Sequence, residues 1–139
     1  MDAKSEGTIL VVDDDRGALD ILTRMLEKEG FEPVAADGGR RALEIARSRP
    51  IDVILLDVMM PEMDGFQVCA ALRAEEGTRE IPVILVTAKD DMETRLAGMK
   101  LGVSEFLAKP INRHDLFARV RAQIHQRAIV HGIDEMLTD

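Results

Sequence analysis

The sequence predicts a doubly wound α/β fold, in which five parallel strands form one sheet with helices on both faces. Short apolar runs alternate five times with segments whose apolar residues recur at helical spacing. The run at residues 53–56 is apolar throughout, which is typical of a strand covered on both faces. A chain of 139 residues that is 46% hydrophobic is long enough for one such domain and too short for two ordinary ones.

The predicted strands are short, and polar or turn residues bound each of them. The second strand contains Pro33, which cannot donate a hydrogen bond to a neighbouring strand, so this strand fits best at an edge of the sheet. The five strands are predicted at residues 8–12, 31–36, 53–56, 81–86 and 103–107.

Between the strands, apolar residues recur every three or four positions, as in amphipathic helices. Gly30 is a suitable end for the first helix, and residues 75–80 form a solvated loop after the third. The fourth helix opens at Asp90 and Asp91. The second helix is predicted to end near Pro50, the third to cover residues 65–74 and the fifth to begin at Asn112 or Arg113. In the first, second and fourth helices the residues that share a face are Leu19, Leu22 and Leu26; Ala42, Leu43 and Ala46; and Met92, Leu96 and Met99. The residues predicted as buried are Phe66, Cys69 and Leu72 in the third helix and Leu116, Phe117, Val120 and Ile124 in the fifth.

Polar side chains stand at the ends of four predicted strands. Asp13 and Asp14 follow the first strand, Asp57 the third, Thr87 the fourth and Lys109 the fifth. The carboxyl ends of parallel strands lie along one edge of a sheet, so these side chains are expected to converge. Carboxylates about 4 Å apart repel by roughly 4 kcal/mol at an effective dielectric near 20, so a cation must hold them together. Mg²⁺ suits such hard oxygen ligands and keeps positions open for phosphate, which indicates phosphoryl chemistry.

An ordered set of motifs accompanies these residues. The set consists of Asp13-Asp14, Asp57, Met60-Pro61-Glu62-Met63-Asp64-Gly65, Thr87-Ala88 and Lys109-Pro110. In this set the chain resembles the response-regulator receiver domains of two-component signalling. The resemblance implies a flavodoxin-like sheet with strand order 2-1-3-4-5, a receiver domain at residues 7–127 and a C-terminal extension or linker at 128–139. It also implies a cis peptide bond between Lys109 and Pro110.

The resemblance assigns a role to each residue of the site. Asp57 would be the nucleophile that takes a phosphoryl group from the phosphohistidine of a sensor histidine kinase or phosphotransfer protein. Asp14 would bind Mg²⁺ directly and Asp13 largely through water, while Met59 would contribute its backbone carbonyl. Lys109 would pair with Asp57 or with the phosphoryl oxygens.

The resemblance further implies a packing switch. After phosphorylation the Thr87 hydroxyl would bind a phosphoryl oxygen, and the Phe106 ring would take up the space that is vacated. The surface formed by the fourth helix, fifth strand and fifth helix would then signal to a downstream output domain or protein, or form a homodimer. Lys100, Glu105 and Arg119 are the charged residues expected at the rim of such a dimer.

By this resemblance the domain is not an enzyme but a signalling domain that assists its own phosphorylation and dephosphorylation. A receiver-like binding module that works without phosphorylation is an alternative. A haloacid-dehalogenase-type phosphatase fits less well, since it needs an acid two residues after the nucleophile and a Thr two further on. Gly17 stands where that Thr would follow Asp13, and Met59 stands where the acid would follow Asp57.

The net charge of −8 disfavours direct binding to nucleic acid or to anionic membranes. The first six residues are polar and unlike a signal peptide, and no apolar run approaches the length of a membrane span, so a cytoplasmic location is expected. The single Cys69 lies in a predicted helix and is expected to be an inert core residue.

The C-terminal residues extend beyond what the sheet requires. Ile124, Ala128 and Ile129 continue a helical pattern, which Gly132 is expected to interrupt. A helix that continues at least to Val130 and would link the domain to an output module is predicted, and a disordered tail is the alternative.

Overall fold

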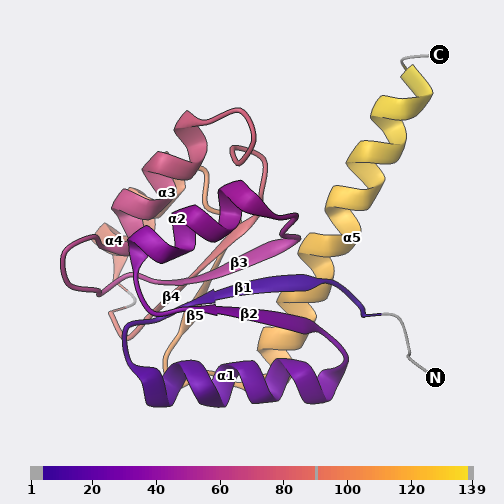
Figure 1. Cartoon of the computed structure of the whole chain (residues 1–139). Helices are drawn as coiled ribbons and strands as arrows, with labels where there is room; N and C mark the ends of the chain where they lie inside the picture. The colour runs from indigo at the N-terminus through magenta and orange to yellow at the C-terminus, as the bar shows by residue number, and fades with distance from the viewer. Residues whose placement is uncertain (1–4, 90, 138–139) are drawn as a thin grey trace.

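The computed structural model contains a five-stranded parallel sheet in the order β2-β1-β3-β4-β5 (Figure 1). This confirms the predicted fold class and the edge position of the second strand. The structure describes residues 5–89 and 91–137, and from residue 130 onward it describes the backbone alone. The elements are β1 (Thr8–Val12), α1 (Arg16–Glu29), β2 (Glu32–Ala36), α2 (Gly39–Ser48), β3 (Val53–Asp57), α3 (Gly65–Ala74), β4 (Val83–Thr87), α4 (Met92–Lys100), β5 (Glu105–Ala108) and α5 (Arg113–Leu137).

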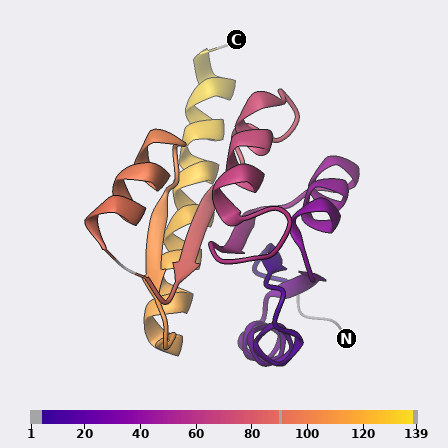
Figure 2. The same cartoon turned by 90° about the vertical axis from the view of Figure 1, so that its left-hand side faces the viewer.

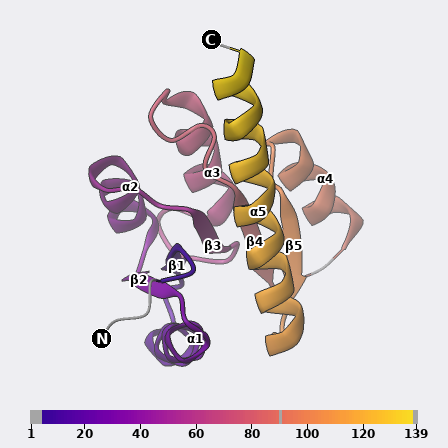
Figure 3. The same ribbon diagram turned by 90° about the vertical axis from the view of Figure 1, so that its right-hand side faces the viewer.

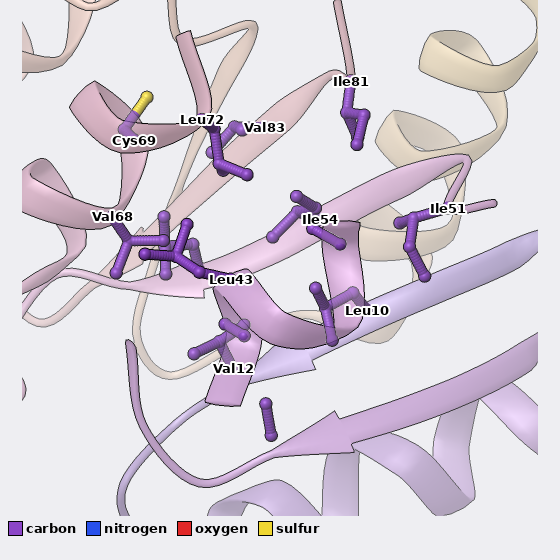
Figure 4. Close-up of a cluster of buried hydrophobic side chains, with 14 of the residues drawn as sticks. Leu10, Val12, Leu43, Ile51, Ile54, Val68, Cys69, Leu72, Ile81 and Val83 are labelled. Carbon is purple, nitrogen blue, oxygen red and sulfur yellow. The ribbon is translucent and has the colours of Figure 1, made fainter. Parts of the chain in front are cut away.

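Each face of the sheet is covered by its own set of helices. Helices α2, α3 and α4 lie on one face and α1 and α5 on the other (Figures 1 and 3). The core on the α2 and α3 side is the larger, and part of it is drawn in Figure 4. Its labelled members are Leu10, Val12, Leu43, Ile51, Ile54, Val68, Cys69, Leu72, Ile81 and Val83. The predicted burial of Cys69 is confirmed.

Aspartates that follow strands begin three of the helices. The Asp15 carboxylate accepts hydrogen bonds from the backbone N–H groups of Gly17 and Ala18 at the start of α1. Asp64 forms a reciprocal capping box with Gln67 at the start of α3. These carboxylates satisfy N–H groups that the first helical turn leaves without partners, so each helix has a fixed starting point.

Strands β4 and β5 begin two residues later and end one residue later than predicted. Pro82 lacks an N–H group, so the ladder of β4 begins at Val83. Val103 donates its N–H to the carbonyl of Gly98 and thereby belongs to the turn that ends α4. The shift brings Thr87 and Ala108 into the sheet as a directly opposed pair.

Helix α4 turns its apolar face outward. Met92, Leu96 and Met99 share one face, as predicted, but they are 72%, 49% and 64% exposed. The buried side of α4 consists of the small residues Thr94 and Gly98. A helix that meets the sheet through small residues lies close to it and leaves its large apolar side chains in solvent.

Some predicted burial is also wrong in detail. Phe66 and Ile124 are only partly buried, because each lies at the margin of a core cluster. The loop predicted as solvated at residues 75–80 buries Thr78, whose hydroxyl donates to the Leu72 carbonyl at 2.7 Å. This bond ties the loop to the end of α3.

Helix α5 runs from Arg113 to Leu137 and extends past the sheet (Figure 3). The prediction that it reaches at least Val130 is confirmed. The expected interruption at Gly132 is wrong, since one glycine within a helix costs only about 1 kcal/mol relative to alanine. The side chains of Ile133, Met136 and Leu137 lie outside the described part of the chain.

Amide exchange is expected to show that α5 is a continuous helix in solution. Residues 124–130 should exchange much more slowly than an unfolded chain, because Arg127 anchors this part of α5 to the Ile51 carbonyl at 3.0 Å. Exchange measured by NMR or mass spectrometry decides the point. Exchange at unfolded rates throughout residues 126–137 would favour the disordered tail instead.

Candidate functional site

Three carboxylates meet at the carboxyl ends of β1 and β3, the side of the sheet that Figure 2 faces. Asp13, Asp14 and Asp57 each offer an oxygen atom within 4.8 Å of the others. Asp57 ends β3 and is only 6% exposed, and Asp13 directly follows β1 and is only 2% exposed. Asp14 is exposed to solvent. The structure therefore brings together the three acids that the sequence predicted as metal ligands.

The two buried acids share one lysine. The Nζ atom of Lys109 lies 3.4 Å from Oδ2 of Asp13 and 3.6 Å from Oδ1 of Asp57. Lys109 follows β5, and the peptide bond between Lys109 and Pro110 is cis, as predicted. The other oxygen of Asp13 accepts the backbone N–H of Asp15 at 2.9 Å. Because both oxygens of Asp13 have partners, Asp14 is the more accessible of the first two acids for direct contact with a metal.

The environment of Asp57 raises the pKa of its carboxyl above the ordinary value. Burial raises the pKa of the Asp57 carboxyl, and the Lys109 ammonium opposes this rise. The charges of Asp13 and Asp14 raise the pKa further, while a hydrogen bond from the Met59 backbone lowers it. Three acids with one lysine keep an excess of negative charge, which a divalent cation would neutralise.

The donor set fits Mg²⁺. Carboxylate oxygens are hard ligands, and Mg²⁺ is commonly held by one or two carboxylates while it keeps several water molecules. Asp14 and Asp57 can supply these oxygens, and Asp13 lies within reach of bound water. Met59, whose backbone carbonyl was predicted as a further ligand, is 65% exposed, so its side chain contributes no packing to the centre of the site.

Gly65 closes the loop between β3 and α3 tightly over the end of β3. A Cβ atom on Gly65 would lie 2.5 Å from the Asp57 carbonyl oxygen and 2.9 Å from the Cα of Val58. The Gly65 N–H donates to the Val58 carbonyl at 2.9 Å. Only glycine allows this approach, so Gly65 holds the backbone of Asp57 in place, a role that the sequence motif alone did not explain.

Thr87 and Phe106 lie near the same edge but do not touch the acids in this structure. The Thr87 residue is only 1% exposed, and its hydroxyl accepts the Lys89 N–H at 2.9 Å. The Phe106 ring is partly buried and packs against the core on the α3 side. Thr87 ends β4 with its hydroxyl held by its own loop, and Phe106 pairs with Leu85, two residues before that end of the sheet.

The fold and site together define a class of protein. A parallel sheet in the order 2-1-3-4-5, with an acid cluster and a lysine at its carboxyl edge, is a doubly wound α/β domain with its candidate site where such folds bind ligands. Residues 9–121 match the family model of the response regulator receiver domain. The chain belongs to this family, and it is a receiver domain of a two-component response regulator.

Individual relatives support the same conclusion. The chain is 45% identical over 122 residues to the response regulator PleD of Caulobacter vibrioides, a match that covers 88% of this chain and 27% of PleD. It is 39% identical over 118 residues to the DNA-binding response regulator MtrA of Mycobacterium tuberculosis, covering 85% of this chain and 50% of MtrA. The solved structure of the chemotaxis protein CheY4 of Vibrio cholerae matches with a TM-score of 0.80 and 30% identity, covering 86% of this chain and 98% of CheY4. The chain thus spans about half or less of the two response regulators.

Within the described part of the chain, no helix is both long and apolar enough to cross a membrane.

Proposed function

We propose that the domain accepts a phosphoryl group on Asp57 from a histidine kinase or phosphotransfer protein, with Mg²⁺ bound beside the acceptor. An Asp57 oxygen attacks the phosphorus atom of a phosphohistidine, the P–O bond forms as the P–N bond breaks, and the imidazole leaves with the electron pair. The protein holds the acceptor, and the charges around it stabilise the transferring group.

One observation carries this proposal. Asp57 is a buried carboxylate at the end of β3 that lies next to the Lys109 ammonium and two further acids. Asp13 is the other buried acid beside Lys109, but its second oxygen already accepts the backbone N–H of Asp15. Lys109 is positioned to pair with a phosphoryl oxygen once the phosphoryl group occupies the carboxylate. Mg²⁺, which receiver domains usually bind, would neutralise charge on the transferring group from the side of Asp14 and Asp13.

The experiment that tests this function is phosphorylation by acetyl phosphate, a small acyl phosphate that can replace the kinase. Uptake of phosphate is expected with Mg²⁺ and is expected to disappear when EDTA removes the metal. Intact-protein mass spectrometry follows the added phosphoryl group directly. A protein that remains unmodified with acetyl phosphate, and also with a panel of histidine kinases, would instead favour the phosphorylation-independent binding module.

Removal of the Asp14 carboxylate is expected to weaken Mg²⁺ binding at least tenfold. Asp14 is the exposed acid of the cluster, and Asp13 already uses both of its oxygens within the protein. Calorimetry or amide NMR with Asp14→Ala measures the change, since the chain has no Trp and no Tyr for fluorescence. Asp20→Ala is a suitable control, because Asp20 is an exposed acid on α1 that pairs with Arg24. An Mg²⁺ affinity that Asp14→Ala leaves unchanged would refute this ligand.

Phosphorylation is proposed to act through Thr87. A phosphoryl oxygen on Asp57 would draw the Thr87 hydroxyl away from the Lys89 backbone, and the Phe106 ring would follow. Met59 and Lys89 lie two residues after Asp57 and Thr87 and line one pocket together. We propose that these two side chains set the access of water to the phosphoryl group and therefore its lifetime.

The surface of α4, β5 and α5 is the proposed signalling surface. Its outward face on α4 contains Met92, Leu96 and Met99, large apolar side chains that a partner could cover. Of the three charged residues predicted at its rim, Glu105 and Arg119 already form an ion pair within the chain. A partner or a second copy would therefore have to compete for this ion pair.

Beryllofluoride, a stable mimic of the phosphoryl group, is expected to change this surface. Amide signals of α4 and β5 should shift on addition of Mg²⁺ and beryllofluoride, and the association constant of a homodimer should increase. NMR and analytical ultracentrifugation measure the two effects. Amide shifts confined to the acid cluster, with no change in association, would contradict the proposal.

The C-terminal end of the chain is the proposed connection to an output domain. The name of MtrA describes a DNA-binding protein, and the match to this chain covers only half of it. We propose that residues 128–139, which include the end of α5, connect the receiver domain at residues 7–127 to an output domain or act as a partner contact. A net charge of −8 makes direct DNA binding by this domain itself unfavourable.

A further inference from the structure

Gly98 on α4 lies directly against the ring of Phe106 on β5. A Cβ atom added to Gly98 would lie 2.7 Å from Cζ and 2.8 Å from Cε1 of the ring, and 3.0 Å from Cδ1 of Leu85. Glycine inside a helix is less stable than alanine, and Gly98 has helical backbone angles that alanine could adopt. Glycine is therefore required here by the ring and not by the helix.

Other residues hold the ring in the same place. The guanidinium carbon of Arg95 lies 5.2 Å from the centre of the Phe106 ring, a distance typical of a cation–π contact. Arg95 is on α4, one turn before Gly98, and Leu85 is paired with Phe106 in the sheet. We call Gly98, Arg95 and Leu85 the ring seat.

The register of β4 and β5 provides a second place for the ring. Thr87 is paired with Ala108, two residues beyond the pair of Leu85 and Phe106. Residues two apart on a strand point to the same face, so Phe106 and Ala108 share the face on which Thr87 lies. Ala108 is small and exposed, so a phenylalanine ring that left the seat could lie over Ala108 beside Thr87.

We propose that Gly98 is a positioning residue that sets the balance between these two ring positions. The seat holds the ring against α4 while the Thr87 hydroxyl is bound to its own loop. When Thr87 moves, the ring leaves the seat, and α4 loses one of the few contacts of its small buried face, which consists of Thr94 and Gly98. This proposal rests on the proposed phosphorylation of Asp57 and adds the residue through which the ring acts on α4.

The variant Gly98→Ala is expected to push the ring out of the seat without phosphorylation. It should raise the affinity for beryllofluoride with Mg²⁺ about fivefold or more, because the state that binds the mimic no longer has to displace the ring. Calorimetry measures this affinity, and NMR of ¹³C-labelled phenylalanine follows the Phe106 ring. Gly77→Ala is the matched control, since a Cβ on Gly77 would meet nothing within 4 Å. An unchanged affinity and an unchanged ring signal in Gly98→Ala would overturn the proposal.

A double variant tests the seat without any phosphoryl group. In the original background Gly98→Ala should raise the unfolding equilibrium constant several-fold, because the added methyl group crowds the ring. In the Phe106→Ala background the same change should lower it about twofold or more, because the ring is gone and the helix preference for alanine then outweighs the remaining contact with the Leu85 side chain. Effects of the same sign and size in both backgrounds would overturn the proposal. If Gly98→Ala fails to fold, rescue by Phe106→Ala supports the seat, and a double variant that also fails to fold refutes it.

The two experiments separate this proposal from the proposed function. If the unaltered protein does not bind beryllofluoride, the phosphorylation of Asp57 fails as a function. The comparison of backgrounds still decides whether Gly98 seats the ring. If the protein binds beryllofluoride but both Gly98 experiments give the contradicting result, phosphorylation of Asp57 is still supported and the role of Gly98 is refuted.

Discussion

Asp57→Asn is expected to lose phosphorylation completely, whether acetyl phosphate or a kinase is the donor. An amide at this position has no anionic oxygen to attack phosphorus and offers Mg²⁺ only a neutral carbonyl. Intact-protein mass spectrometry gives the extent of labelling. Asp15→Asn is the matched control, because Asp15 lies beside the acid cluster and asparagine caps a helix as well as aspartate. Labelling that persists in Asp57→Asn, or that Asp15→Asn abolishes, would contradict the assignment.

The same variant is expected to be more stable than the original protein when no metal is present. Burial disfavours the charged form of Asp57, Lys109 opposes this effect, and the charges of Asp13 and Asp14 add to it, so the pKa is raised on balance and removal of the charge should stabilise the fold. The gain should be about 1–3 kcal/mol, below the roughly 4 kcal/mol of one close charge pair at an effective dielectric near 20.

The sign of the pH dependence follows from the raised pKa of Asp57. The folded state holds this proton more tightly than the unfolded state, so ionised Asp57 destabilises the fold above its folded pKa and has no such effect below its unfolded pKa. The stability advantage of Asp57→Asn should therefore grow as the pH rises from acid to neutral and shrink when Mg²⁺ is added. An advantage that decreases as the pH rises in EDTA would contradict this electrostatic picture.

Arg73→Met is expected to destabilise the domain by about 3 kcal/mol. The Arg73 guanidinium donates to four backbone carbonyls, and its loss leaves several of them without a partner. These carbonyls belong to Arg79 at 2.7 Å, Ile81 at 2.9 Å, Leu101 at 3.2 Å and Gly102 at 3.0 Å. Arg73 thus connects α3 to the segment before β4 and to the turn after α4. Urea unfolding followed by far-ultraviolet circular dichroism measures the loss.

Arg47→Met provides the comparison for this prediction. Arg47 also lies near the end of a helix and forms three hydrogen bonds to Glu75, but the two side chains are 48% and 41% exposed. Solvent screens such a pair, so the expected loss is much smaller than that of Arg73→Met. Equal losses of stability in the two variants would mean that the hydrogen bonds of Arg73 to the backbone stabilise the fold no more than an exposed ion pair does.

The sequence was sufficient to predict the sheet and most of its helices. Fully apolar runs identify buried parallel strands, and Pro33 indicates the edge, because both signals depend on local chemistry. The strand order came from the family resemblance. The boundaries of β4 and β5 were wrong by one or two residues, since hydrogen bonding at Val83 and Val103 decides them and hydrophobicity does not.

The apolar face of α4 was the least predictable part of the fold. Met92, Leu96 and Met99 have the spacing of a core-facing stripe, but the structure exposes them and buries Thr94 and Gly98. A spacing pattern identifies a helical face but not the direction in which it points. The Phe106 ring fills the space between α4 and the sheet, so only the small face of α4 fits there.

The site was predictable as a set of residues but not as a set of distances. Strand ends identified Asp13, Asp57 and Lys109, because parallel strands bring their carboxyl ends together. No sequence pattern shows that Asp13 shares Lys109 with Asp57. Gly65 is part of the sequence motif, but only the structure shows why glycine is needed there: a side chain would collide with the Asp57 carbonyl.

The most direct measurement of the central claim is the position of the phosphoryl group. An acyl phosphate on an aspartate is reduced by borohydride to the corresponding alcohol, which converts that residue to homoserine. The protein phosphorylated by acetyl phosphate with Mg²⁺ should, after reduction and digestion, carry homoserine at residue 57 and retain aspartate at residues 13 and 14. Homoserine at residue 13 or 14, or phosphate on a residue that borohydride does not reduce, would contradict the claim that Asp57 is the acceptor.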